Sequence, residues 1–156
     1  YFSNLKREKT LSLQNAESSE EELGIENIKS WNIFASKVEK HSHKLKNVLE
    51  TMKNNDKTIV AYGASARSST LLNYCQISTE IIDVIIDQSE MKHGLFTAGT
   101  KIKIISPAEG MKKNPDVILL LAWNFKDEII DQLKSRWNWS GDIIIPLPGE
   151  LKIIKI

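Results

Sequence analysis

Residues 58–77 read "TIVAYGASARSSTLLNYCQI". The apolar run from Ile59 to Tyr62 has the length and composition of a buried strand, and it breaks at Gly63. Small and hydroxyl residues follow, with Arg67 among them, and then a stretch of helical character. A strand, a glycine turn and a helix in this order are typical of the first unit of a parallel α/β sheet.

The rest of the chain repeats this alternation. Strands are predicted at 58–62, 81–86, 101–105, 117–122 and 142–146, and helices at 68–74, 107–112 and 126–137. Near-continuous apolar runs such as 117–121 suit strands that are buried on both faces. We therefore predict an α/β fold with a Rossmann-like, mostly parallel sheet and flanking helices.

One long amphipathic helix is predicted ahead of the sheet, from about Asn27 to Met52. Apolar residues recur there at helical spacing, and the Asn and Asp residues at 54–56 suit a helix end. We expect this stripe to face the core, with a partner-binding face as the alternative. Its members are Trp31, Phe34, Val38, Leu45, Val48, Leu49 and Met52.

The composition divides the chain into three parts. Residues 1–24 are polar and charged and are predicted to be a linker or leading segment. Residues 25–150 form the predicted Rossmann-like domain with its long helix, and 151–156 a tail or an edge strand guarded by lysines. Since the chain begins at Tyr1 without a methionine, we expect it to be a piece of a longer protein.

Charge and cysteine content exclude several function classes. A formal net charge of +1 gives no electrostatic argument for nucleic acid or an anionic membrane as partner. No apolar run approaches the roughly 20 residues that span a bilayer. Cys75 is the single cysteine, which fits a cytoplasmic protein, and a structural zinc site is not expected. We expect Cys75 to be buried, and His41, His43 and His93 to lie at the surface.

The turn after the first strand is a candidate anion site. Ligands of open parallel sheets bind beyond the carboxyl ends of the strands, and a helix beginning there presents free N–H groups. Gly63 lets the backbone approach a ligand, and Arg67 supplies a cation that grips phosphate with two hydrogen bonds. Hydroxyls would come from Ser65, Ser68, Ser69 and Thr70. The alternative is a capped helix with Arg67 in solvent.

The same stretch is a poor dinucleotide fingerprint. The segment 63–68 reads Gly-Ala-Ser-Ala-Arg-Ser, so two of the three glycines of that motif are missing. Asp87 lies 24 positions after Gly63, about where an acid that binds ribose would fall. This leaves a stand-alone nucleotide-binding sensor domain as one alternative function and a structural interaction module as another.

Four ordered motifs support a resemblance. They read "IVAYGASARSSTLLNYCQI", "IIDVIIDQSEMKHGLFTAGTKIKIISP", "DVILLLAWNFKDEIIDQL" and "IIIPLP". Together they resemble the C-terminal domain of S-adenosylmethionine-dependent sugar C-methyltransferases over about residues 20–148. Relative to that family pattern, a lysine is replaced by Arg67, a glycine by Ser68 and a histidine by Lys101, and alanines at 61, 98 and 122 replace a glycine and two prolines. Arg67 keeps the positive charge, so the contact with phosphate is expected to be kept.

The resemblance implies a role in substrate binding. In that family a separate domain binds S-adenosylmethionine and carries the catalytic residues, so we expect no catalytic residue, metal or cofactor in this segment. The expected partners are a nucleotide-activated keto sugar and the methyltransferase domain of the same parent chain. The residues expected to bind substrate are Tyr62, Gly63, Ser65, Arg67, Ser68, Ser69, Thr70, Asp87, Trp123 and Asn124, with Trp123 as a stacking plane and Asp87 as an acceptor for sugar or ribose hydroxyls.

Overall fold

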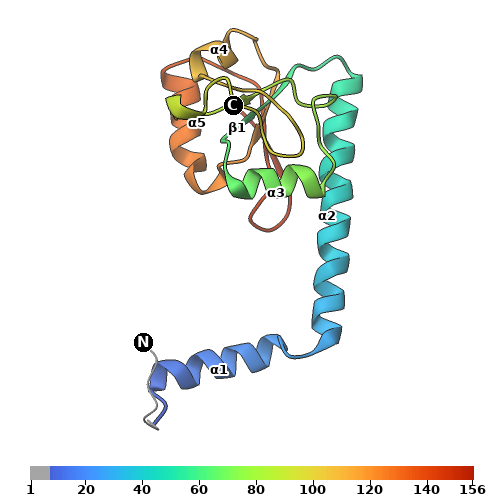
Figure 1. The fold of residues 1–156 in the computed structure, drawn as a ribbon, viewed down its shortest axis with the longest axis vertical. Coiled ribbons are helices and arrows are strands. Elements are labelled where there is room, and N and C mark those ends of the chain that lie inside the picture. Colours follow the sequence, from blue (N-terminus) through green and yellow to red (C-terminus); the bar gives the residue numbers. More distant parts are fainter. Residues whose placement is uncertain (1–7) are drawn as a thin grey trace. The chain divides into compact units, whose positions relative to one another are not determined.

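A computed structural model describes residues 8–156 of the chain. The described residues divide into two units, with the boundary between Lys40 and His41 (Figure 1). Residues 1–7 of the predicted leading segment 1–24 lie outside the described residues. The predicted domain boundary at residue 25 falls before the division between the two units, and it stays a prediction.

The first unit contains a helix that the sequence analysis did not predict. Helix α1 spans Leu11–Leu23, where a linker was expected. Thr10 caps its first turn by accepting a hydrogen bond from Leu13 N, and Gly24 ends it in the left-handed conformation at φ 62°. None of the residues of α1 is buried, so capping and helix propensity, rather than packing in this unit, account for it.

Helix α2 spans Ile28–Asn54 and continues from the first unit into the second. Leu45 and Leu49, in its second half, are fully buried. Trp31 and Phe34 are 52% and 58% exposed and make an edge-to-face contact with each other. The prediction that the whole aromatic stripe faces the core is therefore wrong for its first half, because the described residues of the first unit enclose no core.

The second unit is a six-stranded sheet with strand order β3-β2-β1-β4-β5-β6. Its strands are β1 (Ile59–Tyr62), β2 (Ile85–Ile86), β3 (Ile104–Ile105), β4 (Val117–Leu120), β5 (Asp142–Ile145) and β6 (Lys152–Lys155). The first five are parallel, and β6 pairs antiparallel with β5. This is the doubly wound Rossmann order, so the predicted fold class is confirmed, and residues 152–155 form the outermost strand.

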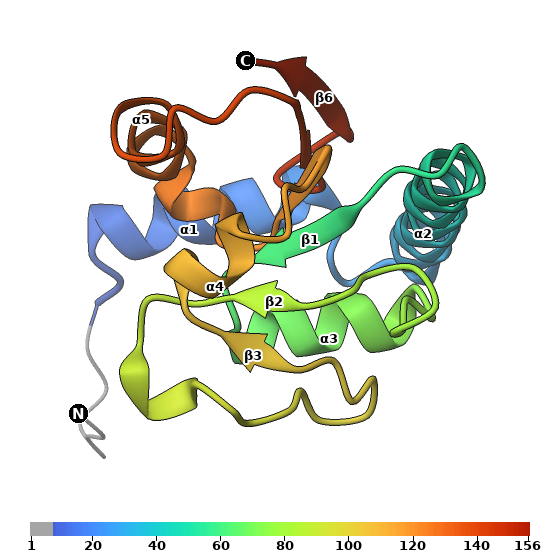
Figure 2. The same ribbon diagram turned by 90° about the horizontal axis from the view of Figure 1, so that it is seen from above.

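Helices cover both faces of this sheet (Figure 2). Alternate strand residues Ile59 and Ala61 face α2 and α3 (Ala66–Tyr74), whereas Val60 and Tyr62 face α4 (Pro107–Met111) and α5 (Lys126–Ser135). Because side chains alternate across a strand, burial of both faces requires an unbroken apolar run, which is what β1 and β4 have. Cys75 is buried within the first of these faces, as expected.

Two predicted strands are much shorter than expected. Ile81 and Ile82 are buried, yet their N–H groups bond to Ser78 O in a turn, so regular strand begins only at Ile85. Lys101 has a φ of 55° and closes a turn onto Thr97 O, which delays β3 to Ile104. The apolar residues of both runs are buried in the core, but only the last two residues of each run pair with a neighbouring strand.

Candidate functional site

A pocket opens where the carboxyl ends of β1, β2 and β4 meet. It has a cavity volume of about 340 Å³. The strand order reverses between β1 and β4, which is the point where open α/β sheets bind their ligands. The residues that line it are Tyr62, Gly63, Ala64, Ser65, Arg67, Asp87, Gln88, Lys92, Ala122, Phe125, Glu128 and Ile129.

Gly63 shapes one wall of this pocket. Its φ is 102°, and its N–H donates to Ile86 O at 2.7 Å. A Cβ at this position would lie 2.5 Å from the Cβ of Ala122. The turn after β1 therefore packs directly on the turn after β4, and only glycine permits this approach.

Ser65 and Ser68 begin helix α3 with a reciprocal cap. Ser65 Oγ accepts from Ser68 N at 3.2 Å, while Ser68 Oγ accepts from Ser65 N and donates to Ser65 O, both at 2.6 Å. Ser68 is fully buried. These hydroxyls are thus committed to the helix start, and Ser65 is the one predicted hydroxyl residue that lines the pocket.

The donors that remain at this turn are backbone and guanidinium groups. The N–H groups of Ala66 and Arg67 donate a hydrogen bond to no acceptor among the described residues, as expected for the first turn of a helix. The Arg67 guanidinium lies 5.4 Å from the ring centroid of Trp123 and reaches the pocket. Thr70 lies outside the lining and donates its hydroxyl to Ala66 O, and Ser69 also lies outside it.

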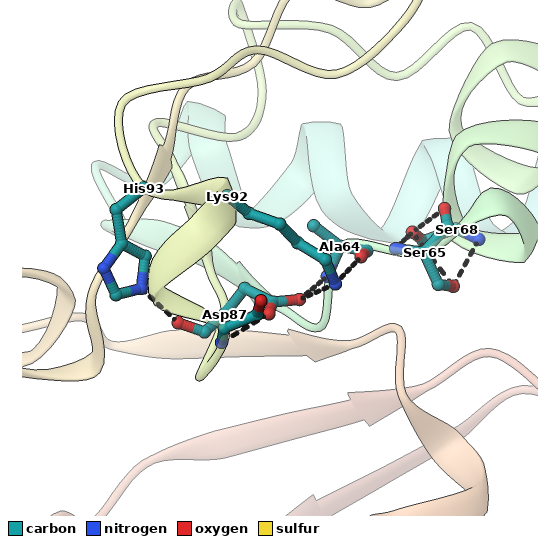
Figure 3. Close-up of polar contacts among 7 residues, drawn as sticks. Ala64, Ser65, Ser68, Asp87, Lys92 and His93 are labelled. Atoms are coloured by element: carbon teal, nitrogen blue, oxygen red, sulfur yellow. Dashed lines mark hydrogen bonds and ion pairs between the residues drawn. The ribbon is translucent and has the colours of Figure 1, made fainter.

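Asp87 fixes the floor of the site (Figure 3). Its Oδ2 accepts from Ala64 N at 2.7 Å and from Lys92 Nζ at 3.1 Å, and its Oδ1 accepts from Ser89 N at 2.9 Å. The side chain is 11% exposed. This nearly buried carboxylate accepts three hydrogen bonds, so it positions the turn after β1 and the side chain of Lys92.

Lys92 is the site residue that the sequence analysis missed. It belongs to the short helix η1 (Glu90–Lys92), and its Nζ donates to Ala64 O at 2.7 Å as well as to Asp87. The pocket therefore has two cations, Arg67 from the first crossover and Lys92 from the second. The available signal was a lysine five positions after Asp87, in the loop that leaves the carboxyl end of β2.

A hydrogen-bonded chain crosses the other side of the pocket. Gln88 Nε2 donates to Tyr62 Oη at 3.2 Å and to Gln132 Oε1 at 2.7 Å, and Gln132 Nε2 donates to Glu128 Oε1 at 3.1 Å. Burial raises the pKa of the Tyr62 phenol, and the nearby Asp87 carboxylate adds to this effect. Tyr62 therefore stays protonated at neutral pH.

Comparison with known proteins identifies the family. The family described as C-methyltransferase C-terminal domain matches residues 2–148. The chain belongs to this family. The C-methyltransferase NovU of Streptomyces niveus is 31% identical over 131 residues, which are 84% of this chain and 31% of NovU. The UDP-D-quinovosamine 4-dehydrogenase of Vibrio fischeri aligns at a TM-score of 0.43 and 24% identity, over 64% of this chain and 94% of that one.

In this C-methyltransferase C-terminal domain, Trp123 and Asn124 were expected to face the pocket, but neither lines it. Strand β4 ends at Leu120, and Trp123 begins the short helix η2 (Trp123–Phe125). Trp123 packs against the buried face beneath α5, with one face toward Arg67, and Asn124 is exposed. Phe125, Glu128 and Ile129 take the expected place in the lining, because the chain turns as soon as β4 ends.

Two negative findings complete the description of the domain. Between residues 8 and 156, no cluster of three or more His, Cys, Asp or Glu side chains has the arrangement of a metal site. In the same part of the chain, no helix combines the length and apolar character needed to cross a membrane.

Proposed function

We propose that this domain binds the diphosphate of a nucleotide-activated keto sugar on behalf of an S-adenosylmethionine-dependent C-methyltransferase. The observation that supports it is the pocket at the switch point, which Arg67 and Lys92 line beside the first turn of α3. Among the described residues, the N–H groups of Ala66 and Arg67 in that turn donate to no acceptor. A diphosphate carries two or more negative charges, and charge-assisted hydrogen bonds from such groups are the strong ones. Family membership supplies the reaction class, and NovU is named a C-methyltransferase.

The expected contacts of the phosphates differ in part from those that the sequence indicated. The amides of the α3 first turn and the Arg67 guanidinium would hold one phosphate. Lys92 is paired with Asp87 and bonded to Ala64 O, so it would offer its third N–H donor to the phosphates. Ser68 contributes through the helix cap, since its hydroxyl is fully used there. Glu128 takes over the acceptor role expected of Asp87, because it lines the pocket with one carboxylate oxygen bonded to Gln132.

The domain's part in catalysis would be positioning. Holding the nucleotide end of the substrate fixes the keto sugar relative to the reacting groups, and such orientation lowers the barrier of a bimolecular step. We place the methyl donor and the catalytic residues in a part of the parent enzyme that this chain does not contain. Consistent with that division, the chain covers 31% of NovU.

Calorimetric titration with thymidine diphosphate tests the proposal. Arg67→Ala should weaken binding about tenfold to a hundredfold, because it removes a charge-assisted pair. Lys113→Ala, an exposed lysine outside the pocket lining, removes the same charge and should change affinity little. Equal affinity of wild type and Arg67→Ala would contradict the proposal.

A parallel titration with NADH tests the alternative of a dinucleotide-binding sensor. That function needs an acidic side chain whose oxygens can accept hydrogen bonds from ribose. The three donors already on Asp87 argue against it. NADH binding that is tighter than thymidine diphosphate binding would favour the sensor.

A further inference from the structure

The first unit carries most of the large apolar side chains that the structure leaves exposed. Within residues 8–156, eight of the fourteen such side chains lie between residues 8 and 40, although this is the shorter of the two units. Leu23, Ile28, Trp31 and Phe34 are among them. Because large exposed apolar patches mark sites of interaction, this unit is a candidate docking surface.

Three side chains form a stripe along the first half of α2. Trp31, Phe34 and Val38 are spaced by three and four residues, and Leu45 and Met52 continue the same spacing in steps of seven. Leu45 is fully buried and Met52 packs against the core. Trp31 and Phe34, by contrast, are more than half exposed, and Val38 is half-buried. Since alternating steps of three and four are the pattern along which two helices pack, the stripe of Trp31, Phe34 and Val38 indicates a site for another helix.

Helix α1 lacks the packing that a helix of its length needs. It has 13 residues, none of them buried, and isolated helices of about this length are marginal in water. The turn that follows it is nevertheless well defined, because Asn27 Oδ1 accepts from Lys29 N at 2.9 Å and the Trp31 indole donates to Ile25 O. A partner that covers the apolar side chains of α1 would supply the missing packing.

The two helices of this unit carry opposite charges. Helix α1 contains four glutamates and neither lysine nor arginine, whereas residues 28–40 contain three lysines and one glutamate. Lys37 and Lys44 each lie one position before a member of the spaced series, Val38 and Leu45, and both are exposed. The stripe therefore suits an acidic helix, while pairing of α2 with a second α2 would bring like charges together.

We propose that two copies of this chain associate through their first units, with α1 of each copy on the stripe of the other. In a single copy α1 does not cover the stripe, since Trp31 and Phe34 stay exposed. Such a dimer is closed, because a two-fold axis makes both contacts identical and uses each surface once. The inference does not rest on the proposed function. Since α1 and the stripe belong to the first unit, dissociation leaves the core of the sheet as it is.

Sedimentation equilibrium of the 156-residue chain over about a hundredfold range of concentration tests the proposal. The wild type should pass from monomer to dimer as the concentration rises. Phe34→Ser should raise the dissociation constant of the dimer about tenfold or more, because it removes an aromatic ring from the interface. Ile33→Ser is the matched control, since Ile33 is equally exposed at 58% but lies off the stripe, and it should change the constant less than about twofold.

Charge reversal tests which helices meet. One variant combines Glu20→Lys, Glu21→Lys and Glu22→Lys in α1, and the other combines Lys37→Glu and Lys44→Glu in α2. Each alone should weaken self-association about tenfold or more, because like charges then face each other in both contacts. An equimolar mixture of the two variants should recover dimerisation to within about threefold of wild type, since opposite charges meet again in both contacts. All the substituted side chains are exposed, so the variants keep the fold.

Each remaining outcome would overturn the proposal. A wild-type chain that stays monomeric at every concentration would assign the stripe to a different partner. Equal effects of Phe34→Ser and Ile33→Ser would show that the stripe is not the contact. An unchanged dimer after charge reversal in α1, or a mixture that stays monomeric, would show that α1 does not meet α2 of the other copy.

Discussion

At the residue scale, Gly63 occupies a turn that has no room for a side chain. Its φ of 102° is a conformation that residues with a side chain rarely adopt, and a Cβ at this position would lie 2.5 Å from the Cβ of Ala122. We expect Gly63→Ala to lower the free energy of unfolding by about 3 kcal/mol, since it adds backbone strain and a collision between two turns. Urea denaturation measures this change.

Gly94 provides the matched control for that prediction. Its φ is 82°, yet a Cβ there would meet no atom within 4 Å. Gly94→Ala should therefore cost only the strain of the left-handed conformation, about 1 kcal/mol. If the two variants are equally stable, the close approach to Ala122 does not matter and the described wall of the pocket is wrong.

The residue scale also shows what the sequence can and cannot predict about the site. Gly63 and Arg67 were predictable, because they follow the strand end directly and their positions depend on local structure alone. Asp87 lines the pocket, but its partner Ala64 lies in the turn after β1, and its partner Lys92 lies five residues further along its own loop. Lys92 and Glu128 were missed, since the local sequence does not fix which side chains of η1 and α5 turn toward the pocket.

At the scale of elements, the cap of helix α3 links stability to the site. Ser65→Ala removes the hydroxyl that accepts from Ser68 N, and we expect it to lower the free energy of unfolding of the second unit by about 1 kcal/mol. Because the freed first turn carries the Ala66 and Arg67 amides, thymidine diphosphate affinity should fall as well. Chemical denaturation and calorimetry on the same variant check both effects.

Helix α1 supplies the control for this cap. Thr10 accepts from Leu13 N in the same way, but α1 has no buried residue. Thr10→Ala should therefore leave both the unfolding midpoint of the second unit and its ligand affinity unchanged. An equal loss in both variants would mean that the Ser65 effect is not specific to α3.

The elements themselves were predictable to the extent that local patterns decide them. Helix α5 and strands β1, β4 and β5 lie where apolar runs and spacing indicated. The long apolar run at 81–86 instead divides into a turn and a short strand, because burial and strand pairing are separate requirements. Helix α1 was missed because its polar composition matched the composition of a linker.

Asp116 joins the amino ends of β1 and β4 and makes stability depend on pH. Its pKa is lowered, first by the hydrogen bond from Thr58 N at 2.9 Å and then by Lys57 at 3.2 Å. A lowered folded-state pKa contributes stability above the unfolded value of about 3.8–3.9, and this is lost as pH falls through the folded pKa. We expect Asp116→Asn to be less stable than wild type at neutral pH and equally stable near pH 2, in urea denaturation at several pH values.

Asp56→Asn is the control for Asp116→Asn. The Asp56 carboxylate is exposed, forms no ion pair within the described residues and lies beside the same Lys57. Its pH profile of stability should run parallel to that of wild type, which separates the bridge from a general charge effect. A constant difference between Asp116→Asn and wild type at all pH values would show that the carboxylate's charge is not what joins the strands.

At the scale of the whole molecule, two apolar layers on one sheet account for the fold. One layer joins α2 and α3 to the sheet through residues such as Leu45 and Leu72, and the other joins α4 and α5 through Met111 and Leu133. The same alternation brings loops from both layers together at the carboxyl ends of β1, β2 and β4, at the switch point. The fold therefore positions the pocket, and its lining residues supply the chemistry.

The last prediction concerns what the first unit contributes to this fold. No residue between Glu8 and Lys40 is buried, whereas the first buried side chain of α2, Leu45, belongs to the second unit. A shortened chain of residues 41–156 should thus keep the urea midpoint of the full chain, and its free energy of unfolding extrapolated to water should agree within roughly 10–15%, the error of that extrapolation. Its affinity for thymidine diphosphate should also be unchanged, since every residue that lines the pocket lies within it. A clear fall in the midpoint would show that residues before His41 stabilise the sheet, and the division into two units would then be wrong.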